Sequence, residues 1–174
     1  MSPLTPIYGE PVTSGPDSGS DSQSRKLKIN VVFTSIEGTV AALIAAATYA
    51  RTLSAQIVIH VPHVMSFRYP LERPPVSPAH FEKLCFALVE EAAVNPDRVA
   101  IEVHSCRSQL SCLTERLTPQ SLVVIGGLRA RWVRREKRLA SDLGKLGHDV
   151  MLVYASVNSA GTHTFSVIQR MLPI

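Results

Sequence analysis

The fold is decided by one stretch of the chain, SLVVIGGLRARWVRREKR at residues 121–138, together with the segment DVMLV at residues 149–153. Leu122–Ile125 is a short apolar run rich in β-branched residues, which predicts a buried strand. It leads into Gly126-Gly127 and an arginine-rich helical pattern, and a second apolar run follows. Open α/β sheets bind anionic ligands at the turn between such a strand and the next helix. The stretch therefore predicts an α/β sheet with a candidate anion site beside the two glycines.

The region before this stretch repeats the alternation of apolar runs and helical patterns. Ser77-Pro78 has the form of a helix N-cap followed by proline at the first helical position, and Gly147 stands where a C-cap glycine is expected. We expect Pro62 to end the second strand. The expected strands cover residues 27–33, 56–61, 98–104, 122–125 and 149–154, and the expected helices cover residues 37–53, 78–94, 110–117 and 132–146. This alternation predicts a single-domain α/β fold with a doubly wound parallel sheet.

The two ends of the chain differ in composition from the region between them. Residues 1–25 are rich in proline, serine and glycine and contain few large apolar side chains. Such a segment cannot offset the entropy lost on ordering, so we expect a disordered N-terminal tail. The folded domain is expected over residues 26–155. Residues 156–174 form a C-terminal extension in which residues 164–168 have the pattern of one further strand.

Composition and charge narrow the classes of protein to consider. The 174 residues are enough for one core, and the net charge of +4 is modest and locally concentrated. A nucleic-acid binder usually shows a broader basic face with interleaved aromatics, so we expect no nucleic-acid partner. Cys85, Cys106 and Cys112 have no disulfide spacing, which indicates a reducing compartment. Without a signal-peptide pattern or a bilayer-length apolar run, the sequence predicts a cytoplasmic protein that does not enter a membrane.

Several local matches resemble the universal stress protein family. They are Lys28-Ile-Asn-Val-Val-Phe-Thr, the alanine-rich helix after it, the strand ending in His60-Val61, and the run Val124-Ile-Gly. The resemblance spans residues 26–155. It implies a five-stranded sheet in the order 3-2-1-4-5 and a homodimer, often formed through the last strand. In members that bind ATP, it also implies a nucleotide lying across the C-terminal ends of the central strands.

The resemblance assigns the first part of a nucleotide site to two strand ends. ATP-binding members end their first strand with an aspartate, where this chain has Thr34 followed by Ser35. A backbone contact to adenine follows the second strand in those members, and Val61 matches that position.

The phosphate loop of the family is matched only at its start. Gly126, followed here by Gly127, matches the first glycine, but Arg129 falls on the second, and residues 136–138 stand where a Gly-Ser or Gly-Thr pair is expected. Glycine serves in such loops because a backbone without Cβ can approach phosphate oxygens closely. The departures therefore predict that ATP is not bound in the family's usual manner.

The arginine-rich segment leaves two interpretations open. Arg129 and Arg131, with the basic residues at positions 134, 135, 137 and 138, offer guanidinium groups that pair bidentately with phosphate. Alternatively, these residues form a solvated helix face with Glu136 and Asp142 as partners, which is the commoner arrangement. Trp132 either packs this helix on the sheet or marks a protein contact.

The sequence shows no motif of a metal centre or an enzyme. His60 and His63 have no acidic or cysteine partner close in sequence, and His104, Cys106 and Cys112 lack zinc spacing although they could meet near the end of the third strand. A Gly-x-Ser-x-Gly elbow, a Walker loop and a Gly-x-Gly-x-x-Gly pattern are missing from the sequence. We therefore expect neither a bound metal nor catalysis.

Two functions from different classes follow from these observations. The first is a universal-stress-protein-like, non-enzymatic stress-response or signalling module that acts through dimerisation and partner binding, without ATP or another cofactor. The second is a nucleotide or phosphometabolite binding protein that uses the point where the strand order reverses. Its site would comprise Thr34, Ser35, Val61, Gly126, Gly127, Arg129 and Arg131. The first is favoured because the phosphate-loop glycines are absent.

Overall fold

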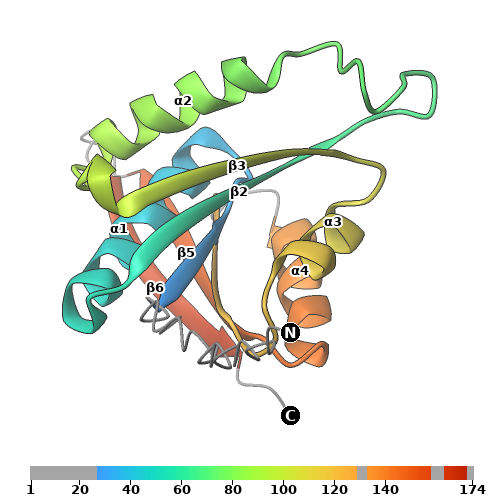
Figure 1. Ribbon diagram of the computed structural model, residues 1–174. Helices are drawn as coiled ribbons and strands as arrows, with labels where there is room; N and C mark the ends of the chain where they lie inside the picture. The colour runs from blue at the N-terminus through green and yellow to red at the C-terminus, as the bar shows by residue number, and fades with distance from the viewer. Residues whose placement is uncertain (1–26, 129–132, 158–162, 172–174) are drawn as a thin grey trace, which may run out of the picture.

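One sheet with the strand order β3-β2-β1-β4-β5-β6 organises the structure, a computed structural model that describes residues 27–128, 133–157 and 163–171 (Figure 1). The first five strands are parallel, which confirms the predicted α/β class and the order 3-2-1-4-5. Residues 1–26 lie outside the described residues, and the expected disordered tail falls among them. The strands are β1 (Lys28–Val32), β2 (Gln56–Val64), β3 (Val99–Cys106), β4 (Leu122–Leu128), β5 (Asp149–Val157) and β6 (His163–Met171).

The sixth strand lies in the C-terminal extension. β6 runs antiparallel to β5 and pairs with it from Val157↔His163 to Val150↔Met171, with a register irregularity between Leu152 and Val153. The further strand suggested at residues 164–168 is therefore present and longer than its pattern indicated. It covers the edge that β5 would otherwise expose.

Helices cover both faces of the sheet. They are α1 (Ile36–Leu53), α2 (Pro78–Glu91), α3 (Gln109–Arg116) and α4 (Val133–Lys145), with a short 3₁₀ turn at Pro96–Arg98. α1 and α2 pack on one face over Val31, Ile59 and Val124, while α3 and α4 pack on the other over Val32 and Ile125 (Figure 1). Adjacent residues of one strand thus face different helix layers, as the alternation of side chains along a strand requires. No helix in the described part of the chain is long and apolar enough to cross a membrane.

The helix ends follow the predicted capping residues. The Ser77 side chain accepts a hydrogen bond from Ala79 N–H before Pro78 opens α2. After α4, Gly147 takes φ +89°, and its N–H donates to the Gly144 carbonyl at 3.0 Å. This left-handed conformation favours glycine, which explains why a glycine follows α4 at this position.

Pro62 does not end the second strand, contrary to expectation. β2 continues beyond it and pairs with β3 as far as Val64↔Cys106. The His60 carbonyl accepts from the N–H of Phe33, so alternate residues of β2 turn their backbone groups towards β1. Pro62 shares that direction, but β1 has already ended opposite it, so its missing N–H costs no sheet hydrogen bond.

The glycine pair was also misplaced. Gly126 and Gly127 lie inside β4, paired with Val153 and Tyr154 of β5, rather than in a turn after a strand ending at Ile125. Both glycines therefore belong to the sheet and not to a turn after it.

Candidate functional site

A pocket opens where the strand order reverses between β1 and β4. From β1 the chain passes to β2 on one side, and β4 lies on the other, so the helices that follow β1 and β4 cover opposite faces. Ligands of open α/β sheets bind in the crevice that this arrangement leaves at the carboxyl ends of the strands. The cavity has a volume of about 460 Å³, within the usual range for small-molecule sites. We call it the switch-point pocket; it is lined by Phe33, Thr34, Ser35, Val61, Pro62, His63, Val64, Phe81, Gln109, Leu128, Arg135, Glu136 and Leu139.

Three of the predicted site residues line this pocket: Thr34, Ser35 and Val61. The Thr34 hydroxyl donates to the Gly126 carbonyl at 2.6 Å, which ties the end of β1 to β4. The Ser35 hydroxyl caps α1 by accepting from Gly38 N–H at 3.1 Å. Both hydroxyls therefore shape the pocket wall through bonds within the protein, and Val61 supplies buried apolar surface.

The two predicted glycines do not line the pocket. A Cβ on Gly126 would lie 1.7 Å from the carbonyl oxygen of Gly38, so glycine is required there because α1 crosses β4 at backbone contact. A Cβ on Gly127 would approach Glu136 and Tyr154 at 3.4 Å. Packing alone explains Gly126, and its closeness to Gly38 leaves no room for a phosphate between them.

The basic residues of the arginine-rich segment divide into different environments. Arg129 and Arg131 lie outside the described residues, as does Trp132. Arg135 lines the switch-point pocket from the first turn of α4. Arg138 instead forms a long ion pair with Asp142 at 4.0 Å on the solvated face of the helix. Of the two interpretations of this segment, the anion site fits the position of Arg135 and the solvated face fits Arg138.

The pocket also contains an acidic group beside this arginine. Oε2 of Glu136 is buried and has no hydrogen-bond partner among the residues that the structure describes, and the same holds for the Tyr154 hydroxyl. Burial raises the pKa of Tyr154, and the negative charge of Glu136 adds to this rise. The wall formed by α4 thus presents both a cation and a hydrogen-bond acceptor.

Sequence reasoning missed most of the pocket because its lining comes from five helices and strands and from the connection between β1 and α1. Phe81 belongs to α2 and Gln109 to α3, and neither carries a recognisable motif. His63 was considered as a metal ligand or as an ordinary strand-end histidine, whereas its ring lies against Phe81, with centroids 4.8 Å apart and planes tilted by 50°. The available signal was that many of the lining residues lie near the end of a strand or the start of a helix.

A second cluster of polar side chains lies on β2 and β3, on the face of the sheet that α3 covers. His60 is paired in register with Glu102, and His104 follows two residues later on the same face. Glu102 Oε2 lies 3.5 Å from His60 Nδ1 and 3.3 Å from His104 Nε2. Burial lowers the pKa of His60, against the opposing effect of the Glu102 carboxylate. We call His60, Glu102 and His104 the histidine cluster.

The candidate cysteines lie near this cluster but are poor ligands. Cys106 and Cys112 interact with each other, and both line a smaller cavity with His104. Burial, aided by Cys112, raises the pKa of Cys106 to about 12, so the thiol stays protonated at neutral pH. Cys85 is buried in the core, and burial raises its pKa to about 11.

No protein-family model, curated protein or solved structure matches the chain, so the comparisons assign it neither a family nor a function. The resemblance to universal stress proteins therefore stays a prediction.

Proposed function

We propose that the protein is a non-enzymatic binding module that holds a small phosphorylated metabolite of the nucleotide type in the switch-point pocket. The observation that carries the proposal is the lining of that pocket, which combines apolar side chains with Arg135 and Glu136. Ligand sites commonly combine a largely apolar lining with a few convergent polar groups.

The apolar wall suits a flat ring. Val61, Val64 and Phe81 come from β2 and α2 and bound one side of the pocket, and Phe33 and Leu128 extend that surface to the ends of β1 and β4. Aromatic and branched side chains of this kind bury planar groups without demanding a particular hydrogen-bond pattern. A purine or similar ring therefore fits this wall.

The polar wall suits a phosphate and hydroxyl groups. A guanidinium forms forked hydrogen bonds with phosphate, which suits Arg135, and the N-terminus of α1 at Ser35 adds the positive end of a helix dipole. The carboxylate of Glu136, which lines the pocket, can accept from ligand hydroxyl or amino groups. Phosphate would be held by a side chain rather than by a glycine loop, so recognition differs from the ATP-binding members of the family resembled.

Equilibrium binding to the full chain tests the proposal, with ATP, AMP and inorganic phosphate as probes. We expect a nucleotide to bind with a Kd below about 1 mM, and Arg135→Gln to weaken binding about tenfold. Val64→Trp, at a half-exposed position on the rim, should fill the pocket and abolish binding without disturbing the core. Arg138→Gln is the matched control and should bind normally. The proposal is wrong if no probe binds, or if both arginine variants lose affinity equally.

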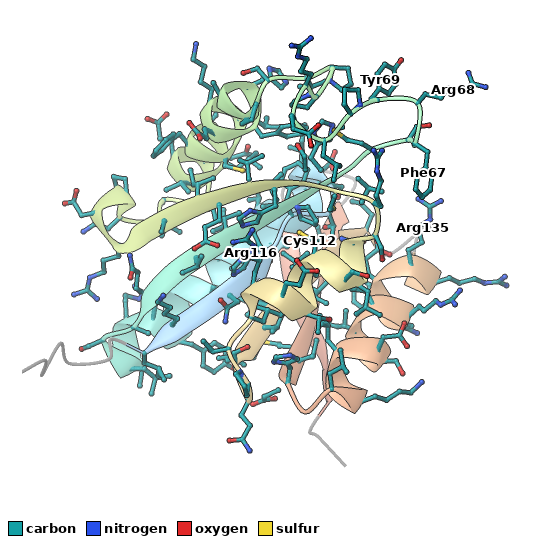
Figure 2. The ribbon with its side chains drawn as sticks, turned by 45° about the vertical axis from the view of Figure 1, so that its right-hand side comes forward. Phe67, Arg68, Tyr69, Cys112, Arg116 and Arg135 are labelled. Carbon is teal, nitrogen blue, oxygen red and sulfur yellow. The ribbon has the colours of Figure 1, made fainter. Side chains whose placement is uncertain are left out.

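A stress-response or signalling module that binds a protein partner is the second candidate, and one exposed loop favours it. Phe67 is 87% exposed at the tip of the segment after β2, next to the half-exposed Tyr69 (Figure 2). Arg107 holds this loop by donating to the Ser66 and Tyr69 carbonyls and lies 5.0 Å from the Phe67 ring. A fixed loop that displays aromatic side chains is typical of a contact surface.

A homodimer is compatible with this second candidate, but not through the edge of β5. That edge is occupied by β6 along the strand, so a dimer would use another surface. A monomeric mass in sedimentation at tens of micromolar would exclude a stable dimer, and a Phe67→Ser variant tests the loop.

A further inference from the structure

The histidine cluster contains a buried ring nitrogen whose environment is incomplete. His60 is 3% exposed, and its Nδ1 has no hydrogen-bond partner among the described residues, although Glu102 Oε2 lies only 3.5 Å away. Burying a polar atom without a partner is costly, so such an atom calls for an explanation.

A neighbouring asparagine fixes which nitrogen of His60 carries the proton. The Asn30 amide nitrogen donates to the Leu122 carbonyl at 3.1 Å, which leaves Oδ1 of the same amide facing His60 Nε2 at 2.9 Å. Because Oδ1 can only accept, Nε2 must be the protonated nitrogen. In the neutral ring, Nδ1 then presents its lone pair towards the Glu102 carboxylate. Two electron-rich atoms that face each other are stabilised by a cation between them.

The two separations that involve Glu102 are close to those between neighbouring ligands of a tetrahedral metal ion. Zinc bonds to histidine nitrogen and carboxylate oxygen of about 2.0–2.1 Å, at tetrahedral angles, place neighbouring ligand atoms about 3.3 Å apart. Glu102 Oε2 lies 3.3 Å from His104 Nε2 and 3.5 Å from His60 Nδ1, and all three atoms lie within 4.8 Å of one another.

We propose that His60 Nδ1, Glu102 and His104 Nε2 bind one divalent transition-metal ion, with Zn²⁺ as the best-fitting ion and a fourth position open to solvent. Two histidines and one carboxylate form a ligand set suited to zinc. The Asn30 amide acts as a positioning group, since an outer hydrogen bond that fixes the tautomer and ring orientation accompanies most metal-binding histidines.

Solvent can reach the histidine cluster, and one neighbouring positive charge acts against a cation there. The Glu102 and His104 side chains are 41% and 20% exposed, and His104 lines a cavity of about 270 Å³ between β3 and α3. Arg116, shown with Cys112 on α3 in Figure 2, lines the same cavity. Its positive charge acts on His60 and opposes a cation. Neutralising Arg116 should therefore strengthen metal binding.

The test measures Zn²⁺ binding to the full chain, free of any histidine tag and stripped of metal with a chelator, by competition with a chromophoric zinc indicator. We expect one equivalent of Zn²⁺ per chain. Glu102→Gln and His104→Gln should each weaken binding about tenfold or more, and Asn30→Ala should weaken it by a similar factor. Arg116→Gln should bind more tightly, and His80→Gln, which alters an exposed histidine on α2, is the matched control and should bind normally.

Substitution by Co²⁺ separates a built site from surface binding. In the His104→Cys variant a thiolate would become a ligand, so the Co²⁺ form should gain a thiolate-to-metal absorption band that the unmodified chain lacks. Far-UV circular dichroism of the metal-free variants shows whether each one is folded. The proposal is overturned if the unmodified chain binds no Zn²⁺, if Glu102→Gln and His104→Gln bind as tightly as the control, or if folded His104→Cys shows no new band.

Discussion

The switch-point pocket and the histidine cluster show two ways in which this sheet brings polar groups together. The pocket collects residues from the ends of strands and the starts of helices, so topology places it. The cluster collects residues from the middle of neighbouring strands, where His60 faces Glu102 through their register. A shift of one residue would turn one partner to the other face of the sheet. A site placed by topology therefore tolerates a small shift between neighbouring strands, whereas a site placed by strand register does not.

The contact between α1 and β4 beneath the pocket should be the most sensitive point of the fold. Gly126→Ala places a Cβ 1.7 Å from the Gly38 carbonyl oxygen, and two backbones must separate to accept it. We expect a loss of about 3 kcal/mol or more in the free energy of unfolding, measured by urea denaturation. Gly144→Ala is the control, since a Cβ there meets nothing within 4 Å and should stabilise the protein by up to about 1 kcal/mol. Equal effects of the two variants would contradict the packing role of Gly126.

The buried hydrogen bond behind the histidine cluster should have the next largest effect. Asn30→Leu keeps the shape of the side chain but leaves His60 Nε2 and the Leu122 carbonyl without a partner, at a cost of about 1–3 kcal/mol. A double-mutant cycle with His60→Leu should give a coupling energy of about 0.5–3 kcal/mol, with the double variant less destabilised than the sum. Strict additivity would show that the two side chains act independently.

A histidine outside both sites should make stability depend on pH. Burial lowers the pKa of His148 below its ordinary value of 6.5, and its Nδ1 lies 3.0 Å from the Ser121 hydroxyl. Below pH 6.5 the unfolded chain binds more protons at this histidine than the folded chain does. The contribution of neutral His148 to the free energy of unfolding is therefore complete above pH 6.5, and it is lost as the pH falls towards the lower pKa of the folded state. The slope is at most about 1.4 kcal/mol per pH unit. His148→Gln should flatten the acid side of a plot of urea midpoint against pH, and an unchanged slope would assign the effect to other groups.

The solvated side of α4 should show the smallest effect. Arg138 is 87% exposed and pairs with Asp142 at 4.0 Å, a geometry that contributes little in water. Arg138→Ala should change the free energy of unfolding by less than about 0.5 kcal/mol in thermal or urea denaturation. A larger loss would mean that the arginine-rich face makes contacts beyond this ion pair.

Much of the fold could be predicted because the signals are local. β-branched runs, the alanine-rich pattern of α1 and the caps at Ser77 and Gly147 each depend on residues a few positions apart. The errors at the ends of β2 and β4 have a common cause. Pro62 and Gly126 have strand-ending chemistry, but the neighbours that make them acceptable within strands come from distant parts of the chain.

The candidate sites were less predictable because they depend on pairing across the sheet. Thr34, Ser35 and Val61 were found through strand ends, whereas Arg135 and Glu136 could not be separated from their solvated neighbours until the direction of α4 was known. Glu102 was not considered as a partner of His60, since the two residues lie on separate strands. Asn30 and His60, each a polar residue within an apolar run, were the visible signs of a buried polar pair.

By itself, the sequence determined that strands and helices alternate along this chain to form an α/β fold. Burial of apolar runs and capping of helices are short-range effects that depend on residues close together in the sequence. Only the tertiary structure decided that Gly126 serves helix packing, that Arg135 faces a pocket, and that His60, Glu102 and His104 converge. Those outcomes depend on register, on the crossing of α1 over β4 and on the direction of α4. Each is set by contacts between residues far apart in the chain.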